Sequence, residues 1–105
     1  MKTIKQLALT AFLFISFTGI AQQKNELLDR TFWKSSPSVA TVKQKIAEGN
    51  DPIAKDSNSF DATTLAITSK ADTEVVKYLL SLEGNEVDKK THDSRIYLHW
   101  ATYAG

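Results

Sequence analysis

The sequence predicts an all-α fold in which pairs of antiparallel helices stack side by side as a solenoid, preceded by a signal peptide. Three observations carry this prediction. Apolar residues recur at helical spacing in residues 73–82, which gives a stripe suited to packing on another helix. The stretch 63–72 resembles the stretch 96–105 at a constant offset of 33 residues, a period typical of repeat proteins. No segment shows convincing alternation of apolar and polar residues, which a half-buried strand requires.

Residues 1–21 have the three-part layout of a secretory signal peptide. Lys2 and Lys5 precede an apolar run, and Gly19 and Ala21 place small residues before the expected cleavage point. An uncleaved membrane anchor is the alternative, but the apolar run of about 14 residues is short for a bilayer-spanning helix of about 20. We therefore expect an exported protein, periplasmic or secreted, without stable membrane insertion after cleavage.

The amino-acid composition excludes several classes of function for the mature part, residues 22–105. A chain of 105 residues holds one domain at most. Cleavage would leave one more acidic than basic side chain, so no basic field is available to bind nucleic acid. The sequence contains no cysteine, which excludes disulfides and thiolate chemistry.

Five helices are expected, over residues 25–34, 37–48, 64–71, 73–82 and 97–103. Ser36 is the expected cap of the second helix, with Pro37 at its first position, where the missing N–H costs nothing. Asp72 or Thr73 can cap the fourth helix, and Gly84 can end it because glycine accepts the left-handed conformation. The connections are rich in Asn, Asp and Ser, as turns require.

The internal repeat involves both helices of the predicted pair. In the first helix the overlay matches Thr63 with Ile96, Leu65 with Leu98, Ala66 with His99 and Thr68 with Ala101. In the second helix an earlier copy matches Val42 with Val76, Lys43 with Lys77, Ile46 with Leu80 and Gly49 with Gly84. A single repeat cannot bury its own apolar face, so the copies are expected to stack on one another.

These motifs resemble the ankyrin repeat. The stretch "IYLHWA" keeps Leu98, His99 and Ala101 of the T-P-L-H-x-A signature, and "TTLAIT" keeps Thr63 and Leu65. The stretch "EVVKYLL" is the closest match, being similar to the second helix of that family. The resemblance predicts a degenerate N-terminal capping repeat at about 25–57, a repeat at about 58–90 and an incomplete repeat at about 91–105.

The resemblance implies a non-enzymatic scaffold that binds a protein partner through loop tips and the concave face. Lys70, Trp100 and Tyr103 fall at positions that often point toward this face, so they are the expected partner contacts. Packing of Trp100 against its own loop is the alternative. Phe60 is either a loop-tip contact or, as we favour, a plug over the helix ends. The histidine of the signature is structural in this family, so His99 is expected to bind backbone.

Catalytic and metal chemistry find little support in the sequence. A metal site of His92, Asp93 and His99 is conceivable, but the spacing fits no standard zinc pattern. Carboxylate pairs such as Asp56 and Asp61 sit in turn-like segments, where turn chemistry explains them. No phosphate-binding glycine pattern is present, and we expect no cofactor.

The last predicted repeat contains only its first helix. We therefore expect the sequence to be the N-terminal part of a longer ankyrin array. A different class of function remains open, in which this region is the docking arm of a longer exported enzyme or enzyme accessory protein. The identity of the partner is not encoded in any motif, because a fold does not select one ligand.

Overall fold

The computed structural model describes residues 24–105, so the signal peptide predicted for residues 1–21 lies outside the described part. In chain order the elements are the 3-10 helix η1 (Glu26–Leu28), α2 (Arg30–Lys34), α3 (Val39–Ala47), α4 (Ala62–Thr68), α5 (Thr73–Leu80), the 3-10 helix η2 (His92–Ser94) and α6 (Tyr97–Ala104). Across residues 24–105 the only β-type pairing is an isolated bridge between Lys55 and Asp61. The prediction of an all-α chain is confirmed for this part.

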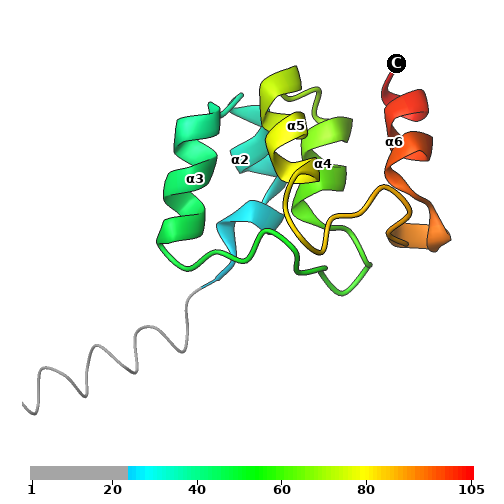
Figure 1. Cartoon of the computed structure of the whole chain (residues 1–105), viewed down its shortest axis with the longest axis horizontal. Coiled ribbons are helices and arrows are strands. Elements are labelled where there is room, and N and C mark those ends of the chain that lie inside the picture. Colours follow the sequence, from blue (N-terminus) through cyan, green and yellow to red (C-terminus); the bar gives the residue numbers. More distant parts are fainter. Residues whose placement is uncertain (1–23) are drawn as a thin grey trace, which may run out of the picture.

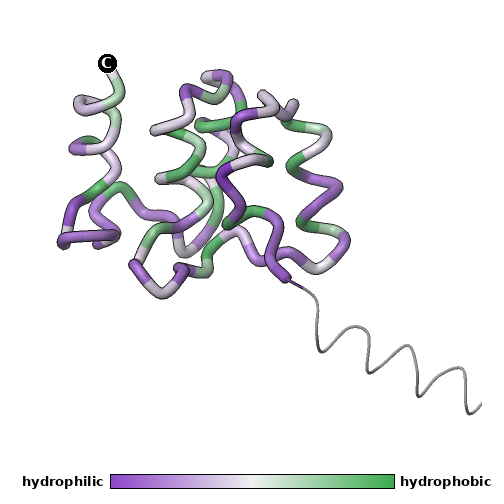
Figure 2. The backbone as a smooth tube through the Cα atoms, turned by 180° about the vertical axis from the view of Figure 1, so that it is seen from behind, coloured by the Kyte–Doolittle hydropathy of each residue, from purple (hydrophilic) through white to green (hydrophobic). Residues whose placement is uncertain are grey.

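The helices lie in two rows (Figure 1). One row contains α2, α4 and α6, with α4 packed between the other two, and the second contains α3 and α5, which contact each other. The rows meet where α5 packs on α4, and among the helices of the described part α6 packs against α4 alone. Both long connections, 48–61 and 81–96, run along the same edge of the molecule, and Figure 2 shows them as mainly hydrophilic beside the more hydrophobic central helices.

The core is formed by side chains of α2, α3, α4 and α5. Trp33 of α2, Val42 of α3, Leu65 of α4 and Leu79 of α5 belong to one cluster and are each at most 1 % exposed. The Nε1–H group of Trp33 donates to the carbonyl oxygen of Leu27 at 2.8 Å. The largest buried side chain therefore keeps its polar atom satisfied, as buried tryptophans require.

The capping residue of α4 corrects the predicted alignment of the stretch 63–72 with the stretch 96–105. The helix starts at Ala62, two residues before the predicted start at 64, because the Asp61 carboxylate accepts a hydrogen bond from the Thr64 N–H at 2.8 Å. The residue that holds the equivalent cap position before α6 is Ile96. Asp61, not Thr63, therefore corresponds to Ile96.

The same shift, from Thr63 to Asp61, changes the other residue pairs that the sequence overlay matched. Leu65 corresponds to Trp100 rather than to Leu98, and the exposed fractions agree, being 1 % for Leu65, 6 % for Trp100 and 69 % for Leu98. Sequence similarity favoured the wrong register because Thr63 matches the threonine of the T-P-L-H-x-A signature. An aspartate caps at least as well.

The first two predicted helices also differ from the structure. The predicted helix over 25–34 is divided into η1 and α2 at Asp29, whose carboxylate accepts a hydrogen bond from the Thr31 N–H at 2.9 Å. The second helix starts at Val39 and is capped by Ser38, so the prediction of Ser36 as its cap is wrong. Ser36 instead adopts a left-handed conformation with φ of 56° in the preceding turn.

The fourth predicted helix is shorter than expected. α5 ends at Leu80 rather than at residue 82, with Ser81 as its C-cap, and Gly84 follows in the turn. Gly84 has φ of +97°, and a Cβ there would lie 2.8 Å from Cγ2 of Ile53. Both the backbone and the neighbouring side chain therefore require glycine at this position.

A buried polar cluster, here called the Asp61 junction, joins α4 to α6 and to the 81–96 connection. The Asp61 carboxylate is fully buried, accepts a hydrogen bond from the Tyr97 hydroxyl at 2.5 Å and pairs with the Lys89 ammonium at 2.9 Å. Lys89 also donates to Oδ1 of Asn85 at 3.0 Å and to the carbonyl oxygen of Ile53 at 2.8 Å. The buried charges are thus paired and hydrogen-bonded, which is the condition for tolerating them in a core.

Tyr97 stays protonated in this cluster. Burial, and secondly the hydrogen bond to Asp61, raise the pKa of the Tyr97 phenol well above its usual value near 10. The phenol therefore acts as a fixed donor to Asp61 throughout the physiological pH range.

We expect Tyr97→Phe to lower the free energy of unfolding by about 1–3 kcal/mol, because Asp61 loses a buried donor. Urea denaturation followed by circular dichroism measures this change. Tyr103→Phe is the matched control, since the Tyr103 side chain is 80 % exposed and its hydroxyl has water available. Equal stability of Tyr97→Phe and wild type would contradict the role of the junction.

Candidate functional site: an apolar groove between α5 and α6

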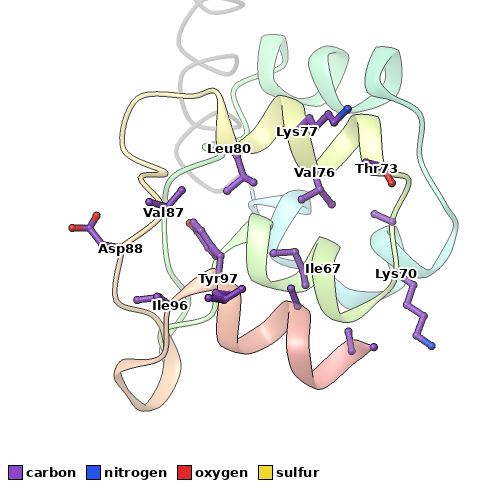
Figure 3. Close-up of a pocket in the computed structure, with 15 residues that line it drawn as sticks. Ile67, Lys70, Thr73, Val76, Lys77, Leu80, Val87, Asp88, Ile96 and Tyr97 are labelled. Carbon is purple, nitrogen blue, oxygen red and sulfur yellow. The ribbon is translucent and has the colours of Figure 1, made fainter.

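An open groove of about 860 Å³ runs between α5 and α6. Figure 3 shows Val76 and Leu80 pointing into it from α5, with Ile67 of α4 at its floor. The wall formed by α6 consists mainly of small and aliphatic side chains, namely Leu98, Ala101 and Ala104, together with Tyr97. The 81–96 connection contributes Val87, which is 73 % exposed, at one end.

The sequence of α5 explains why its apolar surface extends to the groove. Val75 and Leu79 face the core and are at most 1 % exposed. Val76 and Leu80, one position further along the helix, lie about 100° around the axis and line the groove. A helix that packs on the core with one side requires only Val75 and Leu79. Val76 and Leu80 are therefore suited to a second contact.

The polar residues of the lining lie around the rim of the groove. Lys70 and Thr73 lie at the end near the start of α5, and Asp88 lies at the opposite end (Figure 3). Lys77 is exposed and pairs with Glu74 of its own helix at 3.5 Å. The groove therefore combines an aliphatic interior with a basic end and an acidic end.

Lys70 has an unusual backbone conformation for its residue type. It follows the last turn of α4 with φ of 58°, in the left-handed region that favours glycine. Its N–H donates to the carbonyl oxygen of Ile67 at 3.0 Å, which closes the helix end. Among residues 24–105, Lys70 takes part in none of the ion pairs seen.

The three predicted partner contacts do not share one surface. Lys70 lies on the rim of the groove. Trp100 is only 6 % exposed, and its Nε1–H donates to Oγ1 of Thr91 at 2.8 Å, so it packs against its own loop, the alternative considered for it. Tyr103 is 80 % exposed and lies edge-on to Trp100, with ring centroids 6.4 Å apart, outside the groove lining.

Trp100 belongs to an aromatic cluster with Phe60 and His92. Phe60 packs on the core and stacks on His92, with ring centroids 4.5 Å apart, and lies 5.6 Å from Trp100. The guanidinium groups of Arg30 and Arg95 lie over Phe60 and Trp100 at 4.9 and 5.2 Å. These contacts agree with the plug expected for Phe60 and not with a loop-tip contact.

The residues of the repeat signature occupy different environments. Thr63 and Leu65 are buried in α4, whereas Leu98 and Ala101 are exposed along the groove. His99 caps its own helix, because its Nδ1 accepts a hydrogen bond from the Ile96 N–H at 3.1 Å. This contact to backbone agrees with the structural role expected for His99.

The candidate metal ligands are engaged in local contacts. In residues 24–105 no three His, Cys, Asp or Glu side chains come together to hold a metal. Nδ1 of His92 lies 2.8 Å from the carbonyl oxygen of Asn58, while His99 serves its own helix cap. The Asp56 carboxylate accepts hydrogen bonds from the N–H groups of Asn58 and Phe60, which is turn chemistry.

Comparisons with family models, curated proteins and solved structures find no match for this chain. In the part of the chain that the structure describes, the helices are too short or too polar to cross a lipid bilayer.

Trp100→Ala is expected to lower the free energy of unfolding by about 3–5 kcal/mol, because it removes a buried aromatic side chain. Tyr103→Ala should change stability by less than about 0.5 kcal/mol, as exposed substitutions usually do. Chemical denaturation of both variants tests this difference. If Trp100→Ala were as stable as wild type, Trp100 would be a free surface residue.

Lys70→Gly is expected to raise the free energy of unfolding by up to about 1 kcal/mol, because glycine adopts the left-handed conformation without a Cβ clash. Lys77→Gly, which removes a lysine from the interior of α5, should lower it by about 1 kcal/mol. Thermal unfolding of the two variants tests whether stability rises in Lys70→Gly and falls in Lys77→Gly. A loss of stability in Lys70→Gly would show that the lysine side chain is part of the packing.

Proposed function

We propose that this chain is a non-enzymatic protein-binding scaffold built from stacked helix pairs of the ankyrin type. The observation that carries the proposal is the open aliphatic groove of about 860 Å³ between α5 and α6. Contiguous exposed apolar patches of this kind mark interaction sites.

The arrangement of the helices in two rows supports the repeat solenoid. A second observation that supports the repeat is the turn that follows each helix of the α3–α5 row. Gly49 and Gly84 both have positive φ, and each is followed by a buried asparagine, Asn50 or Asn85. Both asparagines donate from Nδ2 to a backbone carbonyl oxygen of the preceding helix, at 2.9 and 3.1 Å. One local structure therefore occurs twice at matching positions, as a repeat requires.

The chemistry of the groove favours binding over catalysis. Its interior is lined mainly by aliphatic side chains, which can contact an apolar surface but cannot transfer protons or act as nucleophiles. The lining also contains Tyr97, whose hydroxyl donates to the Asp61 carboxylate. The lining offers Lys70, Lys77 and Asp88 at its edges, where they can orient a partner.

Export is part of the proposal and rests on residues 1–21 alone. A protein that began near Gln22 after isolation from the periplasm or the medium would agree with it. N-terminal sequencing gives this answer directly.

Affinity capture with the intact chain as bait tests the function. We expect proteins retained by wild type to be lost with Leu98→Asp, which places a charge in the groove, and kept with Thr102→Asp. Thr102 is exposed on the same helix but is not part of the lining, so it is a matched control. Mass spectrometry of the retained proteins compares the three baits.

Equal capture by wild type and Leu98→Asp would remove the groove from the binding surface. If Tyr103→Ala reduced capture instead, the partner would contact the face of α6 that carries Tyr103, and the groove assignment would be wrong.

A further inference from the structure

We propose that protonation of His92 tightens a contact between the two long connections, so that the loop edge of the molecule responds to pH. This contact, here called the His92 clamp, consists of Asn58, Phe60, His92 and Asp93. The inference goes beyond the proposed function and does not depend on it, because none of the four residues belongs to the groove lining.

The imidazole ring of His92 lies between two oxygen acceptors. Its Nδ1 lies 2.8 Å from the carbonyl oxygen of Asn58, which belongs to the 48–61 connection. Its Nε2 lies 3.4 Å from Oδ2 of Asp93. A carbonyl and an ionised carboxylate only accept hydrogen bonds, so both ring nitrogens are placed to act as donors.

A neutral ring can satisfy only one of these two acceptors. The neutral imidazole carries a single N–H, and the lone pair of its other nitrogen would face the remaining oxygen. The imidazolium ion carries an N–H on both nitrogens, so it donates to Asn58 and to Asp93 at the same time. The geometry therefore suits the protonated ring, whose hydrogen bond to the Asp93 carboxylate is charge-assisted.

A strained turn follows His92 and holds the Asp93 carboxylate near its ring. Asp93 and Ser94 have φ of 56° and 58°, in the left-handed region that favours glycine. The N–H and the hydroxyl of Thr91 both donate to the carbonyl oxygen of Arg95, at 2.8 and 2.6 Å, and close the turn. Backbone strain of this kind is typical of switch regions.

Stacking on Phe60 is the second contact of His92 with the 48–61 connection. The two rings are nearly parallel, with an interplanar angle of 13° and centroids 4.5 Å apart, and Phe60 in turn packs on the core. A positively charged ring is attracted to the face of an aromatic ring. Protonation of His92 therefore strengthens the stack on Phe60 as well as the hydrogen bond to Asn58.

Two arginines oppose this effect weakly. Arg30 of α2 lies over the Phe60 ring at 4.9 Å, and Arg95 lies over the ring of Trp100, which is itself 6.4 Å from His92. Both guanidinium groups contact the neighbouring rings, whereas the Asp93 carboxylate contacts His92 itself. The His92 side chain is 35 % exposed, so solvent screens all of these charges and the expected effect is modest.

His99, the other histidine of the sequence, responds to protons in the opposite way. Its Nδ1 accepts a hydrogen bond from the Ile96 N–H at 3.1 Å, so this nitrogen carries no proton in the folded chain. Protonation at Nδ1 breaks this cap of α6. The effects of the two histidines therefore oppose each other in the wild-type chain, and a variant is needed to separate them.

His99→Gln in the intact 105-residue chain separates the two histidines. His99 is the third residue of α6, where the side chain of glutamine can accept the same N–H group without titrating. His92 is then the only side chain of the sequence whose ordinary titration falls between pH 5 and pH 8. The double variant His92→Gln/His99→Gln is the matched control. Urea denaturation followed by circular dichroism at both pH values gives the unfolding equilibrium constants.

Acidification from pH 8 to pH 5 is expected to stabilise His99→Gln about threefold more than the double variant, as a partly exposed ion pair would. The sign follows because the proton completes contacts that the unfolded chain does not have, so stability rises as the pH falls. Asp93→Asn, added to His99→Gln, should reduce this difference. Asparagine tolerates the left-handed conformation of Asp93 but removes its charge.

An equal response to pH in His99→Gln and in the double variant would overturn the proposal, as would a larger gain of stability at pH 5 in the double variant. A full response in the Asp93→Asn variant would also overturn it. The nuclear Overhauser contact between the His92 and Phe60 rings in His99→Gln is a measurement that needs no further variant. We expect it to be stronger at pH 5 than at pH 8, and equal or reversed intensities would contradict the clamp.

Discussion

The buried Asp61 carboxylate is the interaction on which the arrangement of the last two helices depends. It caps α4 through the Thr64 N–H, pairs with the Lys89 ammonium and accepts a hydrogen bond from the Tyr97 hydroxyl. These contacts fix the start of α4, the 81–96 connection and the start of α6 relative to one another. Since α6 forms one wall of the groove, the shape of the groove is set by a polar contact at its base. An apolar core alone would leave the position of α6 less defined, because hydrophobic contact has no direction.

The groove and the core share one helix. α5 uses Val75 and Leu79 to bury itself and presents Val76 and Leu80 to the groove, so its apolar surface is wider than a single contact requires. Such a helix is stable only when one side is fully packed, and the cluster around Trp33 and Leu65 provides that packing. The scaffold can therefore expose aliphatic side chains on the other side without losing its fold.

The sequence predicted the helices better than the contacts between them. The predicted bounds of α5 and α6 lie within two residues of the observed ends, and the contacts of Phe60 with the core agree with the plug expected for it. The register of the repeat was displaced because Thr63 matches the threonine of the signature, whereas Asp61 holds the capping position. The junction itself could not be predicted, because Lys89 and Tyr97 meet Asp61 only after the connection has folded back. A signal existed in Tyr97, which replaces the proline of the motif and so brings a hydroxyl to the helix start.

The attachment of α6 has a consequence for dynamics. Within the described residues it packs on α4 and on no other helix, whereas α5 packs on both α3 and α4. Local opening of this last helix breaks its contacts with one neighbouring helix only, so it requires less free energy than global unfolding. An occupant that touched both α5 and α6 would close that opening, so recognition and ordering of the terminal helix would be thermodynamically linked.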